Sequence, residues 1–401
     1  MGRIEYKWQK SMTRRQALSS LAAMLAGSPL LGNQHDPRPL RDHKRIPGLR
    51  EMVTAFDFEP VCFHNVPLAA YDYTAHGTDS EFTLRRNREV FDWVDLIERR
   101  GAAVDSLDTS AEVLGIKMDF PIMIAPSAAQ GALHPDGEAG MYKGATAASR
   151  TPMIVANGPT VAIEKIAESA NGPRWSQFYP TPDLAASRQR IERFQAAGAT
   201  AIVVTVDQQA TRFERDLHDR NLGGTPRDIS IAPINANATG AARYRVSPNR
   251  LWYNWKYLDD IRPFIKGPML IKGILTAEDA RLCVERGFDG IVVSNHGGRS
   301  MDYAPSTLEV LPEIVDAVGG RIPILIDSGF RRGSDIVKAI ALGADAVCLG
   351  RAARWALGAF GAPGVQRVLE ILQTEFRQAM AGTGRTSIAA LDATCVKANF
   401  L

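Results

Sequence analysis

Gly290-Ile-Val-Val-Ser294 is an apolar run that ends abruptly at Asn295-His296-Gly297-Gly298-Arg299. The run has the length and the β-branched composition of a buried strand. A histidine follows, then two glycines that allow a backbone to approach a flat ligand, and then an arginine. An imidazole base so close to a guanidinium suits an acid substrate that loses a proton or a hydride. A lone histidine at a turn is usually structural, so the interpretation depends on the other strand ends.

The same unit of an apolar run, a polar or glycine-marked end and a helical pattern recurs along the chain. Helical patterns between the runs include 182–197, 276–286, 306–317 and 334–342. Such alternation indicates parallel strands with both faces covered. Eight units predict an α/β fold of the (β/α)8 TIM barrel type, with its site at the C-terminal ends of the strands. A doubly wound open sheet is the alternative, but it usually has fewer units. The eight runs are 121–128, 152–157, 174–179, 201–207, 268–273, 290–296, 322–328 and 346–351.

Composition excludes several classes of function. The chain has 401 residues, 45% of them hydrophobic and 23% charged, which is ordinary for a globular enzyme. A formal net charge of +3 is too small for a nucleic-acid footprint. The four cysteines lie far apart without a Cys-x-x-Cys pair, so no zinc or other metal site is expected.

The N-terminal region departs from this composition. Residues 1–32 contain paired arginines, Arg14 and Arg15, before a short apolar stretch that ends near Leu31-Gly32. This pattern favours an export signal over a membrane span, which needs about 20 apolar residues. The arginine pair resembles a twin-arginine signal and predicts a periplasmic protein, with a leader on a cytoplasmic protein as the alternative.

A polar, proline-containing linker is expected at 33–50, followed by a barrel domain at 51–401. Helix-like patterns at 66–75 and 81–100 predict an N-terminal helical extension of that barrel. The longest irregular stretch, 221–251, is expected to be a lid.

Reactive residues collect at nearly every strand end, as a barrel active site requires. Neutral hydrogen-bonding groups end the first, third and fourth strands, and charged groups end most of the others. These residues are Ser127, Ala128, Gln177, Tyr179, Thr205, Asp207, Lys272, His296, Arg299, Asp327, Ser328, Gly329, Arg331, Gly350 and Arg351.

The ends of the last two strands predict a phosphate site. Loops after strands seven and eight of a barrel commonly bind phosphate with backbone N–H groups and a helix N-terminus. Gly329 and Gly350 allow the backbone to come close, and Arg331 and Arg351 can add charge-assisted hydrogen bonds.

Lys272 ends an apolar strand and needs an electron-rich partner. It could be a Schiff-base nucleophile, or it could stabilise negative charge on a ring. Ser127, Gln177 and Thr205 on neighbouring strands favour a polar-edged heterocycle over an aldehyde. Flavin mononucleotide (FMN) combines such a ring with a phosphate.

Together these residues resemble the FMN-dependent α-hydroxy-acid oxidase and dehydrogenase family, which includes glycolate oxidase, lactate oxidase, L-lactate dehydrogenase and mandelate dehydrogenase. The resemblance extends from about Tyr71 to about Ser387. Its motifs are Tyr71-Asp-Tyr73, Pro126-Ser-Ala128, Gln177-Phe-Tyr179, Thr205-Val-Asp207, Ile271-Lys272-Gly273, Ser294-Asn-His296-Gly-Gly-Arg299 and Asp327-Ser-Gly-Phe-Arg-Arg332.

The resemblance implies an FMN enzyme that oxidises an L-2-hydroxy acid to the 2-oxo acid. It implies that His296 is the base and Asp207 its partner, and that Arg299 and Arg215 bind the substrate carboxylate. Tyr73 and Tyr179 would donate hydrogen bonds to the substrate. FMN would be held by Pro126, Ser127, Ala128, Gln177, Thr205, Lys272, Ser294, Asp327, Ser328, Gly329, Arg331, Gly350 and Arg351. Relatives are commonly tetramers, so a homo-oligomer is expected.

Two departures from the family pattern weaken the case for glycolate itself as the substrate. Ala156-Asn157-Gly158 stands where the family often has hydroxyl residues and a bulky group, which opens that side of the pocket. Thr74 stands where glycolate oxidases have a second tyrosine. A substrate that is lactate-like or larger is therefore expected.

The electron acceptor stays open between oxygen and a respiratory carrier. Ala128 is more frequent in oxygen-reactive relatives, whereas a periplasmic location suits a quinone or a cytochrome. Two further alternatives are a non-catalytic barrel that binds FMN or a phosphate ligand, and an FMN barrel enzyme of another class such as an isomerase. The presence of His296, Asp207, Arg299 and Lys272 argues against both.

Overall fold

The computed structural model describes residues 45–208 and 252–400. The predicted leader at 1–32, most of the linker and the predicted lid at 221–251 lie outside the described residues. From Gly48 onward the chain forms one compact unit.

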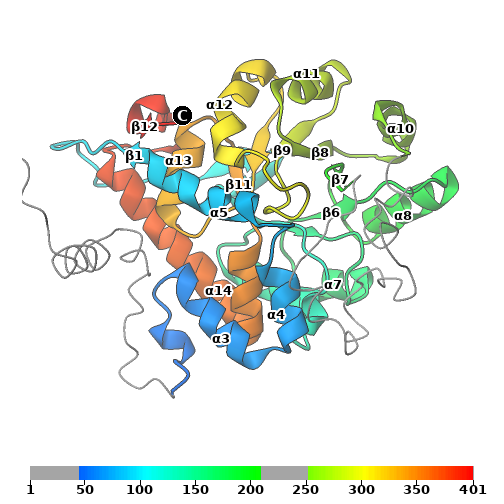
Figure 1. Cartoon of the computed structure of the whole chain (residues 1–401), viewed down its shortest axis with the longest axis horizontal. Helices are drawn as coiled ribbons and strands as arrows, with labels where there is room; N and C mark the ends of the chain where they lie inside the picture. Colours follow the sequence, from blue (N-terminus) through cyan, green and yellow to red (C-terminus); the bar gives the residue numbers. More distant parts are fainter. Residues whose placement is uncertain (1–44, 209–251, 401) are drawn as a thin grey trace, which may run out of the picture. The chain divides into compact units, whose positions relative to one another are not determined.

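Eight parallel strands close into a barrel in strict chain order, which confirms the predicted TIM barrel (Figure 1). Each predicted run coincides with one of them, and only β8 extends beyond its run, by one residue. The strands are β4 (Ile122–Ile124), β5 (Met153–Val155), β6 (Arg174–Phe178), β7 (Ile202–Thr205), β8 (Met269–Ile274), β9 (Gly290–Val293), β10 (Ile324–Ile326) and β11 (Ala346–Leu349).

The apolar runs are continuous because their residues alternate between two cores. In β7, Val203 points into the barrel, and Ile202 and Val204 pack outward against the helices. The same alternation in β4 sends Met123 inward and Ile122 outward. A strand with both faces covered needs apolar residues at every position, and this is the pattern in the sequence.

A helix follows each barrel strand within the described residues. These helices are α6 (Gly137–Ala147), α7 (Ile163–Ser169), α8 (Leu184–Ala196), α10 (Trp255–Ile261), α11 (Ala277–Glu285), α12 (Thr307–Val318), α13 (Gly333–Ala341) and α14 (Arg351–Gly382). Side-chain caps define several starts: Asp183 accepts from Ala185 N and Ala186 N, and Ser306 accepts from Glu309 N.

The helical extension precedes the barrel as α3 (Phe58–Asn65), α4 (Leu68–Ala75) and α5 (Phe82–Glu89). α3 and α4 lie beside α14 (Figure 1). Tyr71 of α4 stacks on Trp355 of α14 with ring centroids 5.1 Å apart. Tyr71 therefore anchors the helix that carries Tyr73.

The helix predicted at 81–100 is wrong in its second half. α5 ends at Glu89, a short 3-10 turn covers Val90–Trp93, and β1 (Val94–Leu96) follows. β1 pairs antiparallel with β12 (Val396–Ala398) near the C-terminal end of the chain. Local periodicity carries no information about a partner about 300 residues away, so the pattern was misassigned.

A hairpin of β2 (Ala111–Val113) and β3 (Ile116–Met118) precedes the first barrel strand. Val113 and Met118 join the core inside the barrel. No helix among the described residues has the length and apolarity that a bilayer crossing requires.

Candidate active site

A cavity of about 300 Å³ lies where the barrel strands end. Most of the residues predicted from the strand ends line it, although they come from distant parts of the sequence. The predicted residues that line it are Tyr73, Pro126, Ser127, Ala128, Gln177, Tyr179, Lys272, His296, Arg299, Asp327, Ser328, Gly329, Arg331, Gly350 and Arg351.

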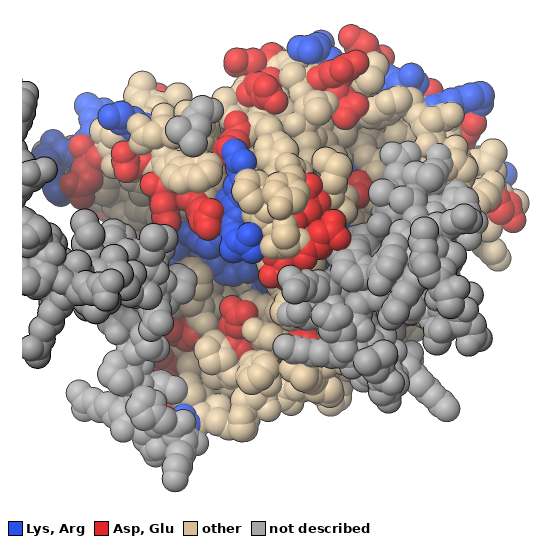
Figure 2. All heavy atoms as spheres, in the orientation of Figure 1, with Lys and Arg blue, Asp and Glu red and all other residues tan. Residues whose placement is uncertain are grey.

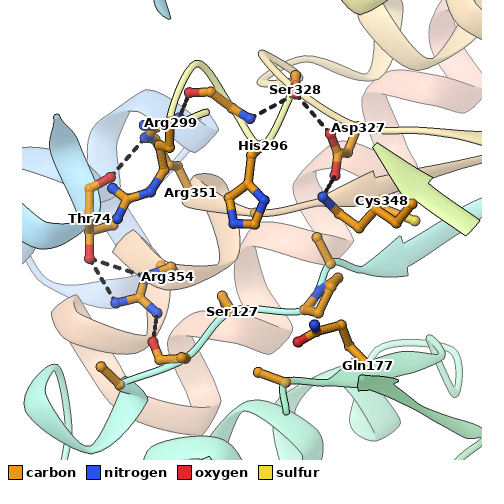
Figure 3. Close-up of a pocket in the computed structure, with 18 of the residues that line it drawn as sticks. Thr74, Ser127, Gln177, His296, Arg299, Asp327, Ser328, Cys348, Arg351 and Arg354 are labelled. Carbon is orange, nitrogen blue, oxygen red and sulfur yellow. Dashed lines mark hydrogen bonds and ion pairs between the residues drawn. The ribbon is translucent and has the colours of Figure 1, made fainter. Parts of the chain in front are cut away.

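His296 enters this cavity from the loop that follows β9 (Figure 3). Its Nδ1 lies 2.8 Å from Oδ1 of Asp207, whose side chain is only 6% exposed. The His296 backbone has φ of +57°, a conformation that L-residues adopt rarely and that recurs at functional sites. Ser294 stabilises it, because its Oγ accepts a hydrogen bond from His296 N at 3.0 Å.

Lys272 lies near the C-terminal end of β8, with a side chain that is 3% exposed. Its Nζ donates to Ser294 Oγ at 2.7 Å and lies 3.5 Å from Asp207 Oδ2 and 3.4 Å from Asp327 Oδ2. Burial alone would lower the pKa of the Lys272 ammonium, but the two carboxylates outweigh burial and raise it. Lys272 is therefore a fixed positive charge, which disfavours the Schiff-base alternative because a nucleophilic amine must be neutral.

Asp207 connects the base to this cation. Burial tends to raise the pKa of its carboxyl, but His296 and Lys272 outweigh burial, and the net pKa lies below its usual value. The carboxylate therefore stays ionised, and it can stabilise a positive charge on the His296 ring.

Arg299 and Arg351 hold the C-terminal end of α4, the helix that carries Tyr73. Arg299 Nη1 donates to the carbonyls of Tyr73 and His76, and its guanidinium carbon lies 4.7 Å from the centre of the Tyr73 ring. Arg351 donates to the carbonyls of Thr74, His76 and Gly297. Because the last carbonyls of a helix lack partners within it, these arginines both cap α4 and bring it to the cavity.

The predicted phosphate loop follows β10. Gly329 has φ of +91°, and a Cβ there would lie 1.9 Å from the carbonyl oxygen of Asn87, so no other residue fits. The guanidinium of Arg331 donates to the Phe330 carbonyl and has no ion-pair partner among residues 45–208 and 252–400. Burial lowers the pKa of Arg331 to about 10, and Asp335 at the start of α13 instead pairs with Arg88.

The polar groups of the cavity fit FMN. Arg331 is a half-buried cation beside a helix N-terminus, which suits a phosphate. Gln177 Nε2 and Thr205 Oγ1 are buried without a hydrogen-bond partner in the described part of the chain. Buried polar groups are rarely left unpaired, so the Gln177 atom, whose residue lines the cavity, indicates a polar ligand there. No cluster of side chains that could bind a metal occurs in the same part of the chain.

Three predicted residues do not line the cavity themselves but contact residues that do. Asp207 and Ser294 contact His296 and Lys272, and Thr205 pairs with Lys272 in the sheet. Arg215, predicted for the substrate carboxylate, lies outside the described residues.

Sequence reasoning missed Arg354, which lines the cavity one helical turn after Arg351. Its spacing in Arg351-Ala-Ala-Arg354 was the available signal.

Comparisons with known proteins agree with this geometry. The family model described as "FMN-dependent dehydrogenase" matches residues 62–398. Glycolate oxidase 1 of Oryza sativa subsp. indica is 39% identical over 84% of this chain and 94% of that protein, and glycolate oxidase of Spinacia oleracea is 35% identical over 87% and 97%. A crystal structure of mandelate oxidase is similar with a TM-score of 0.76 at 34% identity, covering 86% of this chain and 98% of that one. The match over most of the chain shows that this protein belongs to the FMN-dependent dehydrogenase family and uses FMN.

Proposed function

We propose that the protein oxidises an L-2-hydroxy acid to the corresponding 2-oxo acid. The observation that carries the proposal is the His296–Asp207 contact of 2.8 Å beside a cavity that Arg299 also lines. The names of the relatives, glycolate oxidase and mandelate oxidase, support the same class of substrate. FMN, when bound, accepts the two electrons that leave the substrate carbon.

His296 takes a proton from the substrate through Nε2, because Nδ1 is engaged with Asp207. The ring becomes positively charged in this step, and the Asp207 carboxylate stabilises that charge. Arg299 binds the substrate carboxylate, and Tyr73 and Tyr179 orient the substrate from the same cavity. Arg215 stays a second candidate for the carboxylate.

The substrate carries a side chain larger than that of glycolate. Gly158 lines the cavity, and a Cβ placed on it would meet no atom of residues 45–208 or 252–400 within 4 Å. Ala156 is also small, so this wall has room for the side chain of a lactate-like or larger acid.

An anaerobic titration tests the proposal. The holoenzyme is mixed with a panel of L-2-hydroxy acids from glycolate to aromatic acids, and bleaching of the flavin absorbance is recorded. Reduction is expected with at least one acid larger than glycolate, and the His296→Gln variant should stay yellow but unreduced. A wild-type holoenzyme that no acid bleaches would support a non-catalytic FMN-binding barrel instead.

The electron acceptor is oxygen or a respiratory carrier. Reoxidation of the reduced enzyme by air, followed in a stopped-flow instrument, separates the two. Fast reoxidation identifies an oxidase, and slow reoxidation that a soluble quinone accelerates identifies a dehydrogenase.

Residues 1–32 act as a twin-arginine-type leader before a catalytic domain at 51–401, and the domain forms a homotetramer. Mass spectrometry of the mature N-terminus from the periplasmic fraction tests whether residues 1–32 act as a leader. A Lys pair in place of Arg14 and Arg15 should retain the precursor in the cytoplasm. Sedimentation of the holoenzyme tests whether the domain forms a homotetramer.

A further inference from the structure

Arg354 of α14 is a buried arginine at the edge of the cavity that the roles above do not use. It is 4% exposed and lines the cavity. Figure 3 shows it with Arg299 and Arg351 around Thr74, on one side of His296, with Asp327 on the other side. This end of the cavity therefore holds three guanidinium groups.

The contacts of Arg354 connect two segments of the site. Its Nε and Nη2 donate to Thr74 Oγ1 at 3.1 and 2.9 Å, and its Nη1 donates to the carbonyl of Ala128. Its guanidinium carbon lies 5.5 Å from the centre of the Tyr73 ring. Arg354 thus joins the end of α4, which carries Tyr73, to the loop after β4, which carries Ala128.

Thr74, one of the two departures from the family pattern, now has a structural explanation. A larger side chain that followed the direction of Thr74 Oγ1 would collide with the guanidinium. The short side chain at 74 leaves room for Arg354, and its hydroxyl accepts two of the arginine's hydrogen bonds.

The charge of Arg354 has no carboxylate partner among the described residues. Glu138 attracts it electrostatically, but the Glu138 carboxylate accepts from Thr160 and Val161 instead. Burial accordingly lowers the pKa of the guanidinium to about 10, which still leaves it charged at neutral pH. Arg354 also lies in the first turn of α14, which is interrupted by a kink at Phe360 and Gly361 and has no acidic residue in that turn, where the helix dipole disfavours a cation.

Such a charge is stabilised when an anion enters the cavity, because two opposite charges attract strongly where water is excluded. We propose that Arg354 is a positioning residue whose positive charge increases the affinity of the substrate end for carboxylates, while its hydrogen bonds hold Tyr73 and Ala128 in place. This inference rests on the proposed function, since it concerns the same substrate site.

Oxalate binding to the oxidised holoenzyme tests the proposal without turnover. Oxalate is a carboxylate that has no carbon-bound hydrogen to lose, and its binding is followed through the absorbance of the bound flavin. Arg354→Gln keeps a donor for the Ala128 carbonyl but loses the charge, and Arg354→Lys keeps the charge but loses the planar fork. Arg367→Gln, on the same helix, is the matched control, because Arg367 donates to the Met52 carbonyl away from the cavity.

The Kd for oxalate should rise about tenfold in Arg354→Gln, as expected for loss of one charge-assisted interaction. It should rise less than about threefold in Arg354→Lys and stay unchanged in Arg367→Gln. Wild-type affinity in Arg354→Gln, or an equal loss in the Gln and Lys variants, would overturn the role of the charge.

Thr74→Val provides a second test in case Arg354→Gln does not retain FMN. It removes the acceptor of two arginine hydrogen bonds and keeps the charge, so oxalate affinity should fall by less than about threefold, and a tenfold loss would refute the role of the charge. Failure of the proposed function looks different, because a wild-type enzyme that binds oxalate but is reduced by no 2-hydroxy acid still allows the Arg354 comparison.

Discussion

Replacement of Asp207 by asparagine tests the central contact of the site. The substitution preserves the shape of the side chain and removes its charge. His296 would then acquire a positive charge beside a neutral amide during proton transfer, while Lys272 keeps Asp327 as a partner at 3.4 Å.

The magnitude follows from the geometry. Two unit charges 2.8 Å apart attract by about 6 kcal/mol at an effective dielectric constant of about 20. The amide oxygen retains a hydrogen bond to the ring worth about 1–3 kcal/mol. The net loss of about 3–5 kcal/mol corresponds to flavin reduction that is about 10²–10⁴ times slower.

The assay is the rate of anaerobic flavin reduction at saturating 2-hydroxy acid. Asp289→Asn is the matched control, because Asp289 lies before β9 at the opposite end of the barrel and accepts a hydrogen bond from Met269 N. The control should reduce its flavin at the wild-type rate. A rate in Asp207→Asn within about threefold of the wild-type rate would show that the carboxylate does not stabilise the transition state.

Three further predictions concern stability and specificity. Gly329→Ala should lower the free energy of unfolding by about 3 kcal/mol or more, measured by urea denaturation, because the new Cβ would meet the Asn87 carbonyl at 1.9 Å and φ is +91°; an unchanged midpoint would contradict the local backbone geometry. Gly158→Phe should lower kcat/KM for aromatic 2-hydroxy acids about tenfold or more relative to lactate, because it fills the open wall; an unchanged ratio would place the substrate side chain elsewhere. Asp207 should also give a pH-dependent stability: since its pKa is lowered in the folded protein, its contribution is complete above the usual value of about 4 and is lost as pH falls below it. The difference in unfolding free energy between the wild type and Asp207→Asn should therefore shrink as pH falls below about 4, and a difference that grows below that pH would contradict the predicted direction.

The arrangement of the eight strands was determined locally by the sequence. Each strand is short, continuously apolar and closed by a polar or glycine residue, and this pattern follows from burial on both faces. The position of reactive residues at the C-terminal ends of the strands was equally readable, since the barrel brings all such ends to one rim. The motif around His296 alone therefore indicates the correct part of the molecule.

Only the tertiary structure decided which of these residues meet. Asp207 and His296 are 89 residues apart, and Arg354 and Thr74 are 280 apart, so no local pattern links either pair. The pairing of β1 with β12 overrode a helical periodicity for the same reason. Burial without a carboxylate partner, which distinguishes Arg354 from an ordinary surface arginine, depends on what the folded chain places around it. Sequence determines where polar groups end apolar strands, whereas contact, burial and charge balance arise only when distant segments pack together.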